Sequence, residues 1–220
     1  MKLKKIKSFI ITVDGKGGSG KSTAAKLLSK RLGIPHLSSG RLYRWSAKKL
    51  LEDKPKDKIL YLRKRLPKLN YNSLQKINLH TPEISKYSAI IARILAVRKV
   101  MKKAQKSWVQ RNNNRCVVEG RDSHVIFPNA FVKFYLKTNL NTAALRRFKE
   151  LRKKKRKTTL KTVKTDLKQR DYHDTNRRFG RLKLAKDHVL VRTNILNRKE
   201  MVAKMAKEID KKLRLIWKKL

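Results

Sequence analysis

The chain has a single cysteine and no long hydrophobic run. Cys116 is alone among 220 residues, so no disulfide can form within the chain, as is typical of a reducing compartment. We expect it to be a small buried residue of a strand. No run of about eighteen or more apolar residues occurs, and the apolar stretch near the N-terminus is too short for a signal peptide. These features predict a soluble, cytoplasmic protein with no membrane partner.

Acidic residues are also scarce, with 15 Asp and Glu against 61 Lys and Arg, a formal net charge of +46. Such an excess is compatible with nucleic-acid binding. The basic residues, however, are spread over almost every segment, without interleaved aromatic residues or a helix-turn-helix or zinc pattern. Dispersed charge predicts salt-sensitive attraction to polyanions rather than a docking surface. We therefore expect no specific nucleic-acid partner, and nucleic-acid binding is the weakest of three functional hypotheses.

A glycine-rich segment, GKGGSGKS at residues 15–22, follows the apolar run Phe9–Val13 and precedes a helix-forming stretch. Strand, loop and helix in this order predict a phosphate-binding loop (P-loop), in which backbone N–H groups and the helix dipole face the phosphates. We expect Lys21 to reach the β- and γ-phosphates of ATP and the Ser22 hydroxyl to bind Mg²⁺. The predicted donor-binding residues are Gly15, Lys16, Gly17, Gly18, Ser19, Gly20, Lys21, Ser22 and Thr23.

Apolar runs with strand character alternate with amphipathic helical patterns along the chain. This alternation predicts an α/β fold with a P-loop core, in which helices cover both faces of a parallel sheet. Ligands of such sheets bind at the carboxyl ends of the strands. The predicted strands are Phe9–Val13, Cys116–Val118, Phe131–Leu136 and His188–Val191, and the clearest helices are at 20–32, 98–110 and 198–219.

Two segments interrupt the alternation. Residues 54–82 contain Pro55, Pro67 and Pro82 and predict a small inserted subdomain that binds the acceptor. Residues 152–159, RKKKRKTT, fit either a solvated linker or a mobile lid that brings positive charge over a triphosphate, and we expect the lid. An Arg-rich helix, LKQRDYHDTNRR, is expected after it. Residues 1–220 are otherwise expected to form a single domain.

Further motifs specify the second substrate. They are SSGRLYR at 38–44, TPEIS at 81–85, Val97-Arg98, EGRD at 119–122 followed by FPNA at 127–130, and RDYHDTNR at 170–177. Their order and spacing, from residue 9 to about 210, resemble bacterial cytidylate kinases, which are nucleoside monophosphate kinases. That family typically reads DGPAGSGKS, DTGAxYR, TPEVS, a VR pair, DGRDIGTVVFPDA and ERDxRDxxR. The resemblance implies transfer of a phosphoryl group from ATP to CMP or dCMP, with Mg²⁺, by a protein that is usually monomeric.

The resemblance also implies roles for individual residues. Tyr43, Arg44, Arg121 and Arg177 would hold the acceptor phosphate, Arg98 and Asp122 would read the cytosine, and Arg170 and Asp174 would contact the sugar and phosphate. An Arg fork matches phosphate oxygens, and a carboxylate accepts a hydrogen bond from the cytosine amino group. The full expected acceptor set is Ser39, Tyr43, Arg44, Arg98, Glu119, Gly120, Arg121, Asp122, Arg170, Asp174 and Arg177, and the catalytic set is Lys21, Arg121, Arg170 and Arg177.

The reaction itself needs little acid or base chemistry. The acceptor phosphate is already anionic at neutral pH, so catalysis reduces to holding two polyanions in line and neutralising the charge between them. His173 is therefore interpreted as a helix-surface residue and not as a base. Structural alternatives remain open for single residues: Arg121 and Asp122 would also suit an ion pair at a strand end, and Asp171 a helical partner of a nearby arginine.

Several positions depart from the family pattern. Ser38 stands where the family has Asp, and Glu119 replaces the first Asp of its DGRD motif. The segment after Asp122, SHVIFPNA, is one residue shorter than in the family and lacks its glycine, so this loop must take a different path. Base recognition is the function most affected by this change. A kinase of another small acceptor, such as another nucleoside monophosphate or a shikimate-like compound, is therefore the second hypothesis.

Overall fold

A computed structural model describes residues 6–153 and 155–218. It contains a five-stranded sheet of order β2-β3-β1-β4-β5 in which all neighbouring strands are parallel. This confirms the predicted α/β architecture with a parallel sheet. Lys154 of the predicted lid and Lys219 of the predicted last helix lie outside the described residues. The strands are β1 (Phe9–Gly15), β2 (His36–Ser38), β3 (Arg115–Gly120), β4 (Val132–Lys137) and β5 (His188–Arg192).

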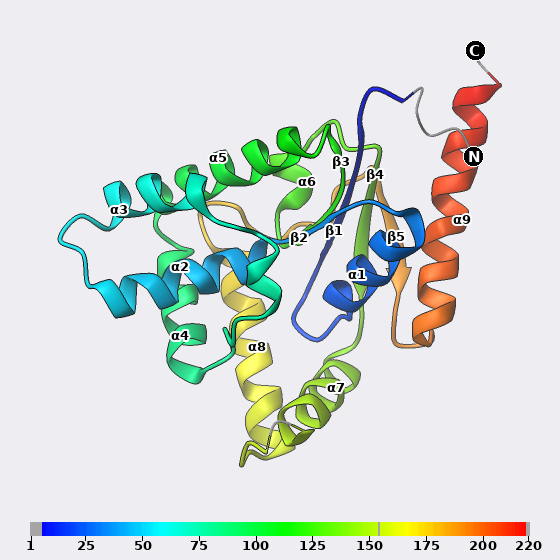
Figure 1. The fold of residues 1–220 in the computed structure, drawn as a ribbon. Coiled ribbons are helices and arrows are strands. Elements are labelled where there is room, and N and C mark those ends of the chain that lie inside the picture. Colours follow the sequence, from blue (N-terminus) through cyan, green and yellow to red (C-terminus); the bar gives the residue numbers. More distant parts are fainter. Residues whose placement is uncertain (1–5, 154, 219–220) are drawn as a thin grey trace.

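Helices cover both faces of the sheet (Figure 1). Helices α1 (Lys21–Leu32) and α9 (Arg198–Trp217) share one apolar cluster with β1, β4 and β5. Helices α5 (Leu95–Arg111) and α6 (Ser123–Ile126) contribute to a second cluster, which includes Cys116 at 0% exposure. The alternation of side chains along β1 explains both clusters, because Ile11 faces one and Ile10 the other. The prediction of a buried Cys116 is confirmed.

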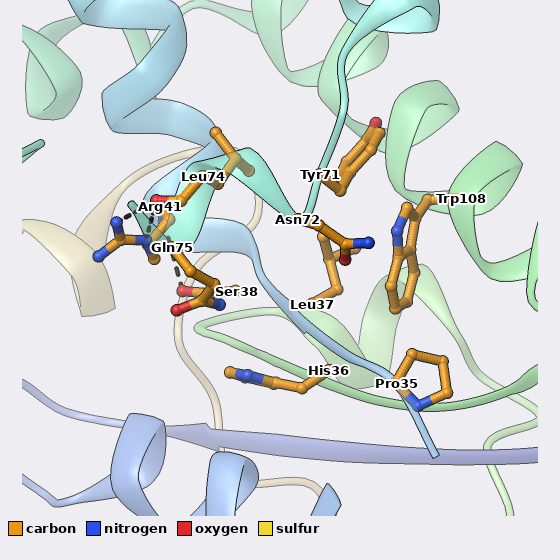
Figure 2. A pocket seen from close by; sticks show the side chains of 10 residues that line it. All are labelled: Pro35, His36, Leu37, Ser38, Arg41, Tyr71, Asn72, Leu74, Gln75 and Trp108. Atoms are coloured by element: carbon orange, nitrogen blue, oxygen red, sulfur yellow. Dashed lines mark hydrogen bonds between the residues drawn. The ribbon is translucent and has the colours of Figure 1, made fainter. Parts of the chain in front are cut away.

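A helical part stands beside the sheet (Figure 1) and has an apolar cluster of its own, which includes Leu42, Leu62 and Met101. The segment predicted as an acceptor-binding subdomain, 54–82, lies within this part, and its separate role stays a prediction. Arg41 joins the segment to the rest: its Nε donates to Leu74 O at 2.9 Å, beside a cavity of about 120 Å³ (Figure 2). The helices here are α2 (Ser39–Asp53), α3 (Lys58–Arg65) and α4 (Pro82–Ile91), with short 3-10 helices η2 (Leu66–Lys68) and η3 (Ser73–Gln75).

Helices α7 (Leu140–Lys153) and α8 (Leu160–Asn176) pack on each other and frame the predicted lid. Arg152 and Lys153 belong to α7, so the lid segment is shorter than the cationic run suggests. Helix α8 begins before the LKQRDYHDTNRR segment, because the Thr159 side chain accepts a hydrogen bond from Thr162 N at 3.1 Å and caps the helix. A moving lid stays a prediction.

Strand β2 was missed by the sequence analysis. Its three residues contain one apolar side chain, Leu37, so no alternation is visible, and the strand exists because it pairs with β3. Among residues 6–153 and 155–218, no helix is both long and apolar enough to span a bilayer.

Candidate active site

The P-loop joins the end of β1 to the start of α1. Gly18 and Gly20 have φ values of 67° and 83°, in the left-handed region that favours glycine. A Cβ on Gly18 would lie 2.7 Å from Ala143 O, so the loop is packed closely against α7. Lys21 begins α1 and donates from Nζ to Lys16 O at 3.2 Å. The loop thus has the strand-to-helix geometry that a bound triphosphate requires.

Oxygen ligands suited to Mg²⁺ lie next to this loop. Ser22 Oγ donates to Glu119 Oε1 at 3.1 Å, and Ser38 Oγ also donates to that oxygen. Glu119 is the last residue but one of β3 and is 2% exposed. Burial would raise the pKa of Glu119, but Lys21 and His36 outweigh it and the pKa is lowered. An ionised carboxylate beside a P-loop hydroxyl is a donor set that fits Mg²⁺, so Glu119, which was predicted among the acceptor residues, could hold such an ion together with Ser22.

Asp174 of α8 gathers three arginines. Its carboxylate lies 2.8 Å from Arg121 Nε, 3.1 Å from Arg177 Nη1 and 3.9 Å from Arg170 Nε. Burial would raise the pKa of Asp174, but Arg121 and Arg170 outweigh it and the pKa is lowered. The predicted residues of EGRD and RDYHDTNR, far apart in sequence, are thus brought together. Arg121 pairs with Asp174 and not with Asp122, so the interpretation as a local strand-end pair is wrong.

The residues expected to read cytosine form a buried pair. Arg98 Nη2 donates to Asp122 Oδ2, and their side chains are 9% and 12% exposed. Burial raises the pKa of Asp122 despite the opposing effect of Arg98. The Arg98 guanidinium lies 6.0 Å from the ring centroid of Tyr43. A Cβ on Gly180 would overlap the Arg98 guanidinium, so the chain after α8 passes directly over this pair.

The cations of the site are crowded. The pKa of Lys21 is lowered to about 7, first by burial and then by Arg121. Burial followed by Arg170 lowers the pKa of Arg44 to about 9. The pKa of Arg170 falls to about 10 for the same reasons, burial and then Arg121, although 46% of its side chain is exposed. Burial and the charge of neighbouring arginines both disfavour the protonated form of these groups, and an anion bound beside them would offset that effect.

Asp171 makes a contact that sequence reasoning did not foresee. Its Oδ1 accepts a hydrogen bond from Gly17 N at 2.9 Å. Asp171 thus contacts the P-loop, whereas the structural alternative expected it to pair with Arg170 or Arg177. A Cβ on Gly17 would lie 2.7 Å from Leu167 Cδ2, which shows how closely α8 approaches the loop. A cavity of about 280 Å³ opens between the P-loop and α8, on the donor side of the site.

The remaining predicted residues lie where the motifs place them. Thr23 is in the first turn of α1, and His173 is on the exposed surface of α8. Ser39 begins α2 beside Gly120, where an added Cβ would be 2.5 Å from Ser39 Oγ. Sequence reasoning missed the contact of Asp171 with the P-loop, the position of Gly180 beside Arg98, and the contact between Asp14 and His124. The one signal in the sequence was that the loop after Asp122, which lacks the family's glycine, contains a histidine, His124.

Comparisons with known proteins agree with this geometry. The family model for cytidylate kinase matches residues 11–211. Cytidylate kinases of Onion yellows phytoplasma and Mycoplasmoides gallisepticum are similar to the chain, at 35% identity over 95% of the chain and 99% of the relative, and at 32% over 92% and 93%. The solved structure of TT1252 from Thermus thermophilus has the same fold, with a TM-score of 0.51, 15% identity, and coverage of 94% of this chain and 99% of that one.

Proposed function

The chain belongs to the cytidylate kinase family, and from this premise we propose that it transfers the γ-phosphoryl group of ATP to CMP or dCMP, giving CDP or dCDP. Two substrates that each carry phosphate must then be held with their reacting groups in line. The P-loop supplies the donor half of such a site. The residues around Asp174 and Asp122 supply the acceptor half.

On the donor side, the P-loop N–H groups and Lys21 hold the phosphates of ATP. The Ser22 hydroxyl and the Glu119 carboxylate, 3.1 Å apart, hold Mg²⁺. An Mg²⁺ ion held by these two residues would supply positive charge to the transferring group. Binding of the triphosphate also brings anionic charge to Lys21 and thereby raises its depressed pKa, so the lysine is cationic when the nucleotide is present.

On the acceptor side, Arg44, Arg121, Arg170 and Arg177 hold the monophosphate, while Arg98 and Asp122 bind the base. Asp174 keeps the guanidinium groups of Arg121 and Arg177 in place before the acceptor arrives. The Asp122 carboxylate suits the cytosine amino group, which donates hydrogen bonds, whereas uracil offers a carbonyl oxygen at that position. No side chain needs to remove a proton, since the attacking phosphate oxygen is anionic.

The crowding of cations is the observation that carries the proposal. Burial lowers the pKa values of Lys21, Arg44 and Arg170, which belong to the P-loop, α2 and α8, and neighbouring arginines lower them further: Arg121 acts on Lys21 and Arg170, and Arg170 acts on Lys21 and Arg44. Such an arrangement costs stability in the free protein. Two phosphate-bearing ligands that meet between the P-loop and Asp174 would remove this cost and explain why so many cations converge.

Replacing Arg121 by alanine tests the acceptor half. We expect kcat/KM for CMP to fall by roughly 100-fold, because about 3 kcal/mol is the usual cost of losing one such donor. Arg214→Ala, an exposed arginine of α9, serves as the control for loss of a positive charge. Unchanged kinetics for Arg121→Ala would show that the acceptor phosphate binds elsewhere.

We further propose that the enzyme acts as a monomer in the cytoplasm, with nucleotides as its partners. Size-exclusion chromatography with light scattering tests the oligomeric state. A mass of two chains would contradict this part of the proposal without affecting the reaction assigned above.

A further inference from the structure

The buried carboxylate of Asp14 ties the P-loop to the acceptor side of the site. Asp14 is 0% exposed and immediately precedes the first residue of the P-loop. Its Oδ1 accepts a hydrogen bond from Ser123 N at 2.9 Å, and its Oδ2 accepts one from His124 N at 2.9 Å. The His124 ring provides a third contact, with Nδ1 3.0 Å from Oδ2. Since a carboxylate only accepts, Nδ1 carries the proton of this bond.

These contacts restrict the position of Arg121 and Asp122, the two residues that precede Ser123. Ser123 and His124 directly follow Arg121 and Asp122, and in the sheet Asp14 is paired with Gly120. The three bonds to Asp14 therefore fix the direction in which the chain leaves β3. Two of them come from the backbone and would form with many residues at these positions. The third depends on a side chain with a donor at the position of Nδ1.

The His124 ring is also held from its other side. It is 8% exposed, and the His188 ring of β5 packs edge-on against it, with centroids 4.5 Å apart and an interplanar angle of 64°. Tyr135 of β4 packs against His188 in turn, at 5.7 Å. Burial, and then His124, lower the pKa of His188. Packing on this side restricts rotation of the ring and favours the orientation in which Nδ1 meets Asp14.

The composition of this cluster resembles a metal site, but most of its polar atoms already take part in hydrogen bonds. Both Asp14 oxygens already accept N–H groups. His188 Nδ1 accepts a hydrogen bond from Ala185 N at 2.8 Å, so the proton of the neutral ring is on Nε2. Nε2 is buried without a hydrogen-bond partner among the described residues, and while it carries the proton it has no lone pair for a cation. The cluster is a hydrogen-bonded brace.

We infer that His124 is a positioning residue for acceptor recognition, because its bond to Asp14 braces the shortened loop and thereby holds Asp122 against Arg98 and Arg121 toward Asp174. The inference rests on the proposed function. A loop one residue shorter and without glycine has fewer conformations available. The histidine selects the conformation in which both acceptor contacts form.

Three substitutions of His124 distinguish a positioning role, through its hydrogen bond to Asp14, from a role in packing alone. Asn places its amide donor near the position of Nδ1, Gln places it farther out, and Ala removes it. For His124→Ala we expect the Kd and KM for CMP to rise about tenfold, the effect of losing one hydrogen bond to a charged group, with the preference for CMP over UMP reduced. His124→Asn should recover most of the loss and His124→Gln should not. The KM for ATP should stay within about twofold, since Thr193 Oγ1 holds Ser19 O independently at 2.9 Å.

Amide hydrogen exchange of the acceptor-free protein provides a readout that does not depend on the assigned substrate. Peptides covering residues 119–127 should exchange faster in His124→Ala and His124→Gln than in the wild type and in His124→Asn. Equal exchange and equal CMP affinity in wild type and His124→Ala, or an Asn variant no better than Gln, would overturn the inference. A wild-type enzyme inactive with CMP would instead overturn the proposed function, and the exchange result would still decide the role of His124.

Discussion

Lys21 is expected to lower the stability of the nucleotide-free protein while it enables the reaction. Its pKa of about 7, against 10.5 for an ordinary lysine, means that the unfolded chain binds this proton more tightly. Stability should therefore rise with pH between about 7 and 10.5, and the full cost is present below pH 7. At about 1.4 kcal/mol per tenfold change in proton affinity the ceiling is about 5 kcal/mol, which screening by water at this partly exposed group reduces to about 1–2 kcal/mol.

Lys21→Met removes the charge and keeps the apolar stem. Thermal unfolding of the nucleotide-free variant at pH 6 should give a Tm that is higher than that of the wild type by about 2–8 °C, and the gain should shrink at pH 9.5. Its kcat should fall by about 100-fold or more. Lys26→Met, at an exposed position of the same helix, is the control and should change neither quantity appreciably. A variant that is less stable than the wild type at pH 6, or a gain independent of pH, would refute this reasoning.

Two further substitutions test the metal ligand Glu119 and Gly180, the residue that lies over the Arg98–Asp122 pair. Glu119→Gln should raise the Mg²⁺ concentration needed for half-maximal rate by about tenfold, since a ligand loses its charge; an unchanged Mg²⁺ titration would remove Glu119 from the metal site. Gly180→Ala should weaken CMP binding about tenfold or more in calorimetry and leave ATP binding intact, because the added methyl group overlaps Arg98 beside Asp122. If Gly180→Ala and the wild type bound CMP equally well, the segment after α8 would have moved without disturbing the Arg98–Asp122 pair.

The parts of the molecule that depend on local sequence could be predicted. Strand β1, the P-loop and α1 follow from a contiguous pattern of apolar residues, glycines and a helical stretch. Strand β2 could not be found in this way, because its three residues have no periodicity of their own and depend on β3.

For the candidate site, too, the sequence identifies residues but not their contacts across the fold. Motifs identified Arg121, Asp122 and Asp174, but their pairing depends on contacts across the fold: Arg121 and Asp174 are 53 positions apart, and the Asp14–His124 contact spans 110. Which carboxylate meets which cation is decided by burial and sheet register, which a single sequence does not display. The absence of the family's glycine after Asp122 indicated a changed loop, and only the structure shows that His124 of this loop contacts Asp14.

The most direct test is the formation of ADP from ATP and Mg²⁺ in the presence of CMP, dCMP, UMP, AMP, GMP or shikimate. We expect strong stimulation by CMP or dCMP, less by UMP and none by the purine nucleotides or shikimate. We also expect this stimulation to be lost in Lys21→Met. An enzyme that no pyrimidine monophosphate stimulates, or that responds best to shikimate or a purine nucleotide, would contradict the proposed function.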